Sequence, residues 1–227
     1  GASDGGEAAA GHAENEAKPA AAQIEQRVEV VAPALSRTLF AGGRIVRIPE
    51  MKDRNGARVS DIHLRRDEES GAYEIFTRGV RLGSYRIVTE LPELSPAALL
   101  ADKAPEPASD QYLQLPDDLP GRVRELARKI AEGVPHHPYL LALAVQAYLQ
   151  EHYTYTLDTS PPPEGRDFAD DFLFESKEGY CTHFSTAMVV LLRSLGVEAR
   201  WVKGFAPGVP DPDRPNTYIV RHADAHA

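Results

Sequence analysis

The chain has 227 residues, 42% of them hydrophobic and 7% aromatic, with 25 basic and 34 acidic side chains and a formal charge of −9. This length is enough for one good core or two modest ones. The acidic balance argues against a nucleic-acid groove or an anionic membrane surface as partner, because both need clustered Lys and Arg. These residues contain no uninterrupted apolar run of about 18 residues, as a membrane span requires, and no signal peptide.

The first half predicts a β unit behind an unstructured leader. Residues 1–25 are expected to be a disordered leader or linker, since residues 1–22 lack any aromatic residue, Leu, Ile, Val or Met. Residues 26–95 show short alternating stretches separated by Gly and Asn turns, which indicates a small antiparallel β unit. Its expected strands are 28–31, 44–48, 59–64, 73–77 and 85–89. Residues 96–118 form a connection, which begins with a short helix capped by Ser95.

The second half, residues 119–227, predicts a separate domain of mixed structure. Apolar residues on one helical face indicate helices over 120–132, from Pro138 onward, and from Cys181 to a glycine cap at Gly196. Between them we expect a strand over 153–157 and a turn of helix over 167–174. Two later strands, 197–205 and 216–221, are joined by a proline-containing loop. The order predicts an α+β domain in which an antiparallel sheet follows the cysteine helix.

Cys181 is the only cysteine, so it cannot form an internal disulfide and does not report the compartment. It stands at the expected start of its helix, two residues after Gly179. Unpaired N–H groups and the helix dipole at that end should lower the thiol pKa and favour the nucleophilic thiolate. The Cys181 N–H can also stabilise a developing oxyanion. The alternative is a small buried side chain without a chemical role, as for most free cysteines.

Three histidines compete to be the general base for this thiol. His183 is disfavoured, because residues two apart on a helix do not face each other. His222 and His226 lie four apart in an expected strand and would point to the same face. Their spacing therefore does not decide between them.

Two clusters suggest bound cations but have simpler explanations. A zinc site built from Cys181 and these three histidines would lack a second cysteine, and its one His-x-x-x-His spacing falls in an expected strand. The acids of residues 167–171 suggest calcium or magnesium. Because phenylalanines are interleaved with them, Asp167 is instead expected to cap a helical turn while Asp170 and Asp171 face solvent. We expect no metal and no cofactor.

Five motifs in the second half stand in a fixed order. They are DFLFE at 171–175, GYCTHF at 179–184, LGVEAR at 195–200, GF at 204–205 and DAHA at 224–227. Together they resemble the transglutaminase-like superfamily, and within it the membrane-anchored bacterial TgpA-type branch. The resemblance covers about residues 116–227.

The resemblance implies a papain-like core, in which a cysteine at a helix N-terminus packs on an antiparallel sheet that carries the histidine. It assigns the nucleophile to Cys181 and the base to His226, not to His222. The third family residue, an Asp on the strand after the histidine, would lie beyond Ala227, and Asp224 is not expected to replace it. The catalytic domain is therefore expected to be truncated at its C-terminal end, and the chain can be inactive by itself.

The implied activity is extracytoplasmic acyl transfer. Cys181 attacks a glutamine-type carboxamide, a thioester forms, and a lysine-type amine takes the acyl group. The implied partners are proteins or peptides with glutamine and amine groups, and the parent protein is expected to be anchored in the bacterial cell membrane. Two alternatives stay open. With water as acceptor, the same Cys–His site is an amidase or protease; without turnover, the domain is a binding or scaffolding part of a membrane protein.

Overall fold

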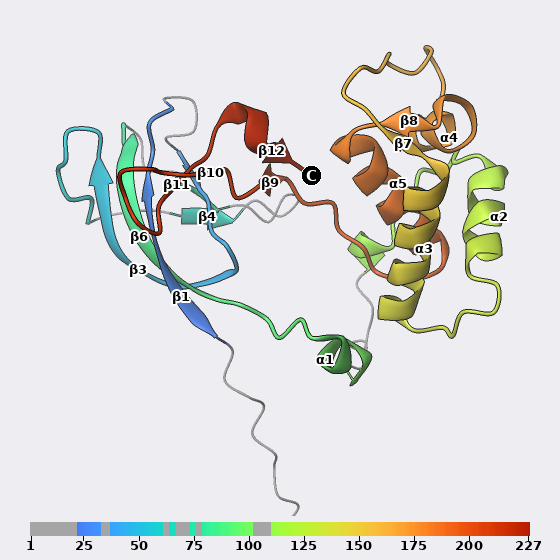
Figure 1. Ribbon diagram of the computed structural model, residues 1–227, viewed down its shortest axis with the longest axis horizontal. Coiled ribbons are helices and arrows are strands. Elements are labelled where there is room, and N and C mark those ends of the chain that lie inside the picture. The colour runs from blue at the N-terminus through green and yellow to red at the C-terminus, as the bar shows by residue number, and fades with distance from the viewer. Residues whose placement is uncertain (1–21, 33–36, 61–63, 67–72, 76–78, 102–109) are drawn as a thin grey trace, which may run out of the picture.

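A computed structural model describes residues 22–32, 37–60, 64–66, 73–75, 79–101 and 110–227. Most of the expected leader lies outside these residues, and the first strand already begins at Gln23. Two hydrophobic clusters form, one in the β unit and one among the later helices. Figure 1 shows the corresponding two lobes, with α1 (Pro96–Ala101) on the path between them. The described residues thus form two modest cores and not one large one.

The β unit contains two three-stranded antiparallel sheets. Strands β1 (Gln23–Glu29), β6 (Leu82–Glu90) and β3 (Arg44–Asp53) form the larger sheet in that order, and β2 (Thr38–Leu39), β5 (Tyr73–Ile75) and β4 (Leu64–Arg66) form the smaller one. The antiparallel unit is confirmed, although β1 lies mostly before the expected strand 28–31. Part of the expected strand 59–64 lies outside the described residues. The core of the unit consists of Leu39, Met51, Leu82, Tyr85 and Ile87.

The helical unit, which we define as residues 110–199, begins with a short 3-10 turn, η2 (Asp110–Tyr112). The first two helices expected in this half are present as α2 (Gly121–Ile130) and α3 (Pro138–His152), and their apolar residues face one core. The turn of helix expected over 167–174 forms as α4 (Phe168–Asp171) followed by one π-helical turn, η3 (Phe172–Ser176). Helix α5 (Cys181–Ser194) follows, and its apolar residues pack against α2 and α3.

The end of α5 shows why it stops where the sequence predicts. Gly196 has φ +74°, a left-handed conformation that costs glycine little. Its N–H donates to the Arg193 carbonyl, and the Val197 N–H donates to the Leu192 carbonyl, both at 3.0 Å. This pattern is the Schellman motif, and it pairs carbonyls that the end of a helix leaves open.

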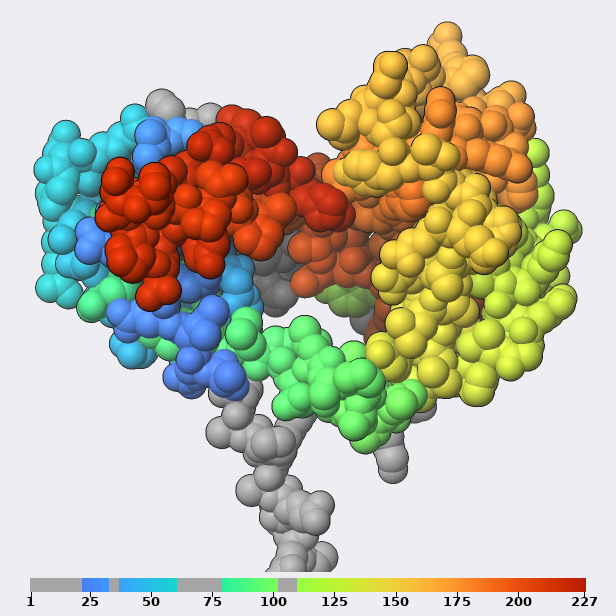
Figure 2. Space-filling model, viewed as in Figure 1, coloured from blue at the N-terminus to red at the C-terminus, as the bar shows by residue number. Residues whose placement is uncertain are grey.

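The C-terminal strands, which we define as residues 204–226, differ from the expectation. Only β9 (Gly204–Phe205), β10 (Val209–Pro210), β11 (Tyr218–Ile219) and β12 (Ala225–His226) are strands, and the expected strand 197–205 is extended chain up to residue 203. The expected loop between the two strands contains β10, which pairs with β11 as a hairpin, while β9 pairs antiparallel with β12. In the view of Figure 1, β10 and β11 overlie the β unit, while β9, β12 and the chain end lie on its side toward the helical unit, and Figure 2 shows a hollow between them and the helical unit. Among the described residues, no helix combines the length and hydropathy needed to cross a bilayer.

Candidate active site

Cys181 is the first residue of α5, as the sequence predicts, and its side chain is half-buried. The approach to the helix is fixed by β8 (Glu178–Gly179), which pairs in parallel with β7 (Thr154–Tyr155). The Thr156 N–H donates to the Gly179 carbonyl at 2.8 Å and extends this pairing. Because the first amides of a helix have no intrahelical acceptor, the thiol lies in a partly positive environment.

His183 has a structural role at the same helix start. Its side chain is 7% exposed, and its ring lies 4.7 Å from the Phe168 ring and 4.6 Å from the Tyr180 ring, measured between centroids. The Tyr180 N–H donates to Nδ1 of His183 at 3.3 Å. Burial lowers the pKa of this imidazole, which favours the neutral ring that such an acceptor requires. The expectation that His183 is not the base is consistent with this geometry.

His226 lies on β12, directly opposite Gly204 on β9. The Ala206 N–H donates to the Asp224 carbonyl at 2.8 Å and extends the pairing on the side away from the chain end. In the view of Figure 1, the N-terminal end of α5 points toward this strand pair. The candidate nucleophile and the candidate base are therefore carried by different parts of the chain.

His222 does not share a strand with His226. The expectation that both histidines point to the same face of one strand is therefore wrong. His222 begins a 3-10 turn, η4 (His222–Asp224), so period-two alternation does not relate the two rings. The Asp224 carboxylate accepts the Arg221 N–H at 2.6 Å. This carboxylate stabilises the turn, and the structure shows no hydrogen bond from it to His226.

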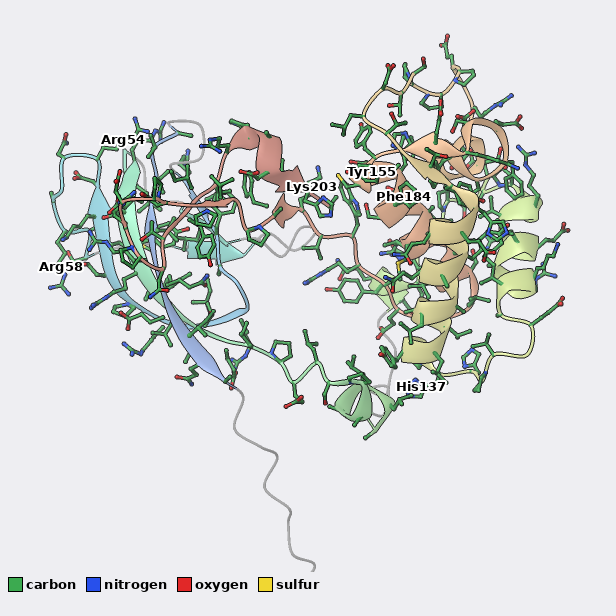
Figure 3. All side chains as sticks on the ribbon, in the orientation of Figure 1. Arg54, Arg58, His137, Tyr155, Phe184 and Lys203 are labelled. Carbon is green, nitrogen blue, oxygen red and sulfur yellow. The ribbon has the colours of Figure 1, made fainter. Side chains whose placement is uncertain are left out.

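A contact that the sequence did not predict joins α5, on the face that carries Cys181, to the chain that leads to β9. The Trp201 indole N–H donates to the Ser185 hydroxyl at 2.7 Å, and Ser185 lies one turn after Cys181 on α5. The Lys203 ammonium lies 4.4 Å from the centroid of the Trp201 ring. Lys203 is labelled in Figure 3, as is Tyr155, whose ring contacts Phe184 on α5. Trp201 is the only tryptophan of the chain, and that was the one feature of the sequence that could have pointed to this contact.

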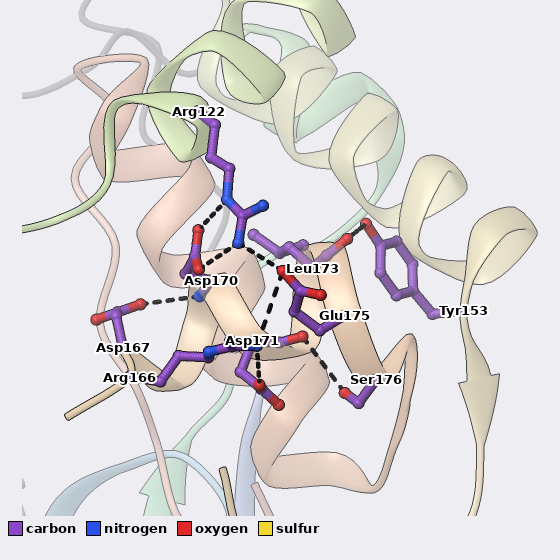
Figure 4. Close-up of polar contacts among 9 residues, drawn as sticks. All are labelled: Arg122, Tyr153, Arg166, Asp167, Asp170, Asp171, Leu173, Glu175 and Ser176. Atoms are coloured by element: carbon purple, nitrogen blue, oxygen red, sulfur yellow. Dashed lines mark hydrogen bonds and ion pairs between the residues drawn. The ribbon is translucent and has the colours of Figure 1, made fainter. Parts of the chain in front are cut away.

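The acidic stretch near this site is an ion-pair network (Figure 4). Asp167 caps α4 as expected, accepting the Asp170 N–H at 2.8 Å. Asp170, however, does not face solvent: it is 5% exposed and accepts two hydrogen bonds of 2.6 Å from Arg122 on α2. The hydrogen bond from Arg122 holds the pKa of this carboxyl below its usual value.

Three further ion pairs complete the network, one of them between Arg166 and Glu175 at 3.8 Å. Arg122 also binds Glu175 at 2.9 Å, and Arg166 binds Asp171 at 3.2 Å. Guanidinium groups therefore occupy the space in which a cation would lie. Within the described residues, no group of three or more His, Cys, Asp or Glu side chains is arranged to hold a metal ion.

A helix that begins with a cysteine and a later strand that carries a histidine are elements from which Cys–His acyl-transfer sites are built. Residues 124–227 match the family model of the transglutaminase-like superfamily, and this part of the chain is a transglutaminase-like domain. The expected fold class and the TgpA-type relationship are confirmed by the comparisons that follow.

Two curated proteins and two solved structures are similar to the chain. YebA of Bacillus subtilis (strain 168), an uncharacterized protein, is 42% identical over 134 residues, which are 56% of this chain and 18% of that protein. The protein-glutamine gamma-glutamyltransferase of Pseudomonas aeruginosa is 38% identical over 115 residues, 51% of this chain and 17% of that protein. The chain thus spans less than a fifth of the length of either relative.

The solved structures are the periplasmic domain of TgpA from Pseudomonas aeruginosa, with and without bound ethylmercury. Both match with a TM-score of 0.61 and 26% identity, and both cover 90% of this chain. The match covers 65% and 62% of the two solved chains, respectively. Because 90% of this chain is included, the likeness extends over the β unit as well as the transglutaminase-like domain.

Proposed function

We propose that this chain is part of a cysteine acyltransferase that acts on glutamine-type carboxamides through a thioester. The observation that carries the proposal is the position of Cys181 at the first turn of α5, with a histidine-bearing strand beyond that end of the helix. The Pseudomonas relative is named a protein-glutamine gamma-glutamyltransferase, which supports protein glutamine as the acyl donor. The similarity to a periplasmic domain supports an extracytoplasmic location.

The chemistry proceeds in two halves. The Cys181 thiolate attacks the carboxamide carbon, and the helix-start N–H groups stabilise the oxyanion that forms. His226 in its protonated form gives its proton to the leaving nitrogen, so that ammonia departs and a thioester remains. A primary amine then loses a proton to His226 and attacks the thioester carbon. The acyl group passes to the amine, and the thiolate is restored.

The test uses a labelled primary amine as acyl acceptor and a glutamine-containing protein as acyl donor, with the protein extended past Ala227 so that a third catalytic residue can be present. We expect amine incorporation that Cys181→Ala abolishes and that His226→Gln reduces by about 10²–10⁴-fold. His222→Gln is the matched control, and it should retain activity. Ammonia or peptide release without incorporation would instead identify an amidase or protease. If the extended protein shows neither activity, the domain is a binding or scaffolding domain.

A further inference from the structure

Of the two candidate catalytic residues, only Cys181 lies on an element whose side chains belong to one of the two described cores. Cys181 begins α5, whose apolar side chains belong to the core of the helical unit. That core and the partly buried residues packed on it extend along the chain only as far as Ala199. His226 follows on β12, so its support must be sought among the contacts of the C-terminal strands.

An aromatic pair joins those strands to the β unit. The Phe205 ring on β9 meets the Phe40 ring edge to face, with centroids 5.2 Å apart and an interplanar angle of 76°. Phe205 pairs with Ala225 on β12, the residue that precedes His226. This ring contact therefore links the β unit to the strand pair that carries the imidazole.

The position of Phe40 is itself fixed from within the β unit. The Tyr85 hydroxyl donates to the Phe40 carbonyl at 3.0 Å and accepts the Phe40 N–H at 2.7 Å. Tyr85 is 2% exposed in the core of the unit, and burial raises its pKa to about 12. The phenol therefore keeps its proton at neutral pH and can maintain both bonds.

A second contact lies at the tip of the β10–β11 hairpin. Asp211 accepts a hydrogen bond from Nε of Arg214 at 2.8 Å, and the same guanidinium contacts Glu29 at the end of β1 at 3.2 Å. Exposed pairs of this kind add little to stability. The pair is a second point, besides Phe205, at which the C-terminal strands meet the β unit.

We propose that the β unit sets the position of His226 relative to Cys181. Phe205 is the positioning residue, because its ring connects the β unit to the strand pair that carries His226. This inference rests on the proposed function, since it takes Cys181 and His226 as partners. The path runs from Tyr85 to Phe40, from Phe40 to Phe205, and from β9 to β12. Productive Cys–His geometry therefore depends on a unit that contributes no catalytic group.

The test is the pH profile of Cys181 alkylation by iodoacetamide, a neutral reagent that reports the thiolate fraction. The chain has no other cysteine, so all labelling occurs at this site. A nearby imidazolium extends thiolate formation to lower pH, and each unit of pKa is tenfold in thiolate below the pKa. We expect Phe205→Ala to lower the rate at pH 6.5 about tenfold and to shift the profile toward that of His226→Gln.

Companion variants separate positioning from general damage. Phe40→Ala should give the same shift, and combining it with Phe205→Ala should add little, because both remove one contact. Phe205→Tyr keeps the ring and should restore the wild-type profile. Tyr218→Ala is the matched control, since it removes an exposed aromatic ring from β11 in the same group of strands. Circular dichroism in the helical region shows whether α5 stays folded. If Phe205→Ala unfolds the helix, Phe205→Leu takes its place.

The outcomes distinguish the two hypotheses. A wild-type profile in the folded Phe205 variant, with a shifted profile in His226→Gln, would overturn the support role and leave the Cys–His pair intact. A wild-type profile in His226→Gln itself would overturn the pair, and with it this inference. A shift in both, restored by Phe205→Tyr, supports the proposal.

Discussion

An ideal β-carbon at position 179 would lie 2.5 Å from Cγ of His183, so the backbone of Gly179 and this buried ring occupy adjoining space with no room for a side chain. The pair lies on either side of Cys181 in sequence. The glycine of the Gly-Tyr-Cys run therefore has a packing role as well as a turn role. It allows the capping imidazole to fill the space under the first turn of α5.

Gly179→Ala should displace the His183 ring and the first turn that carries Cys181. We expect a loss of about 1–3 kcal/mol in the free energy of unfolding, as is usual for overpacking, together with a changed rate of Cys181 alkylation. Urea denaturation and iodoacetamide labelling measure the two effects. Gly121→Ala is the control, because a β-carbon at that helix start meets nothing within 4 Å. Equal behaviour of the two variants would contradict the close packing at position 179.

His183 should make stability depend on pH near neutrality. Burial lowers its pKa in the folded chain, so between that value and its ordinary value of 6.5 the unfolded chain binds more protons. Stability is then full above about pH 6.5 and declines as the pH falls through that value. Urea denaturation from pH 8 to pH 5 measures the slope. His183→Gln keeps an acceptor for the Tyr180 N–H, and we expect a flatter profile from it; an unchanged slope would refute the assignment.

Asp170→Asn should destabilise the helical unit by about 1–3 kcal/mol, because it replaces a charge-assisted acceptor in a buried position. The pKa of this carboxyl is lowered by Arg122, so its contribution is present above the unfolded value of 3.8 and is lost as the pH falls through the lower folded value. Thermal unfolding at pH 7 and pH 3 should show a smaller difference between variant and wild type at the lower pH. Glu175→Gln provides the comparison: it alters an exposed partner of the same arginine and should have little effect.

Trp201 and Ser185 should be energetically coupled. A double-mutant cycle with Trp201→Phe and Ser185→Ala should give an interaction energy of about 0.5–1.5 kcal/mol, the size of a typical hydrogen bond. Denaturant unfolding of the four proteins measures it. Ser194→Ala combined with Trp201→Phe should instead be additive, because the Ser194 hydroxyl donates to the Val190 carbonyl. Additivity in the first cycle would show that the contact does not join α5 to the chain before β9.

The sequence predicted best where the determining interactions are local. The limits of α5 follow from an apolar stripe and a left-handed glycine, and both act within a few residues. The cap at Asp167 is equally local, since its acceptor and donor lie three residues apart. Asp170 could not be assigned in this way. Its burial depends on Arg122, which lies 48 residues away, and periodicity contains no information about such a partner.

The candidate site divides in the same manner. By itself, the sequence determined the position of Cys181 at a helix start, and the resemblance to a family selected His226; the catalytic roles of both remain predictions. Only the tertiary structure decided that His222 lies in a 3-10 turn, that the strands near His226 are short, and that the Phe40 ring contacts the Phe205 ring. The physical reason is the range of the forces involved. Helix periodicity and capping act over one or two turns, whereas strand pairing and aromatic packing depend on residues that meet only when the chain has folded.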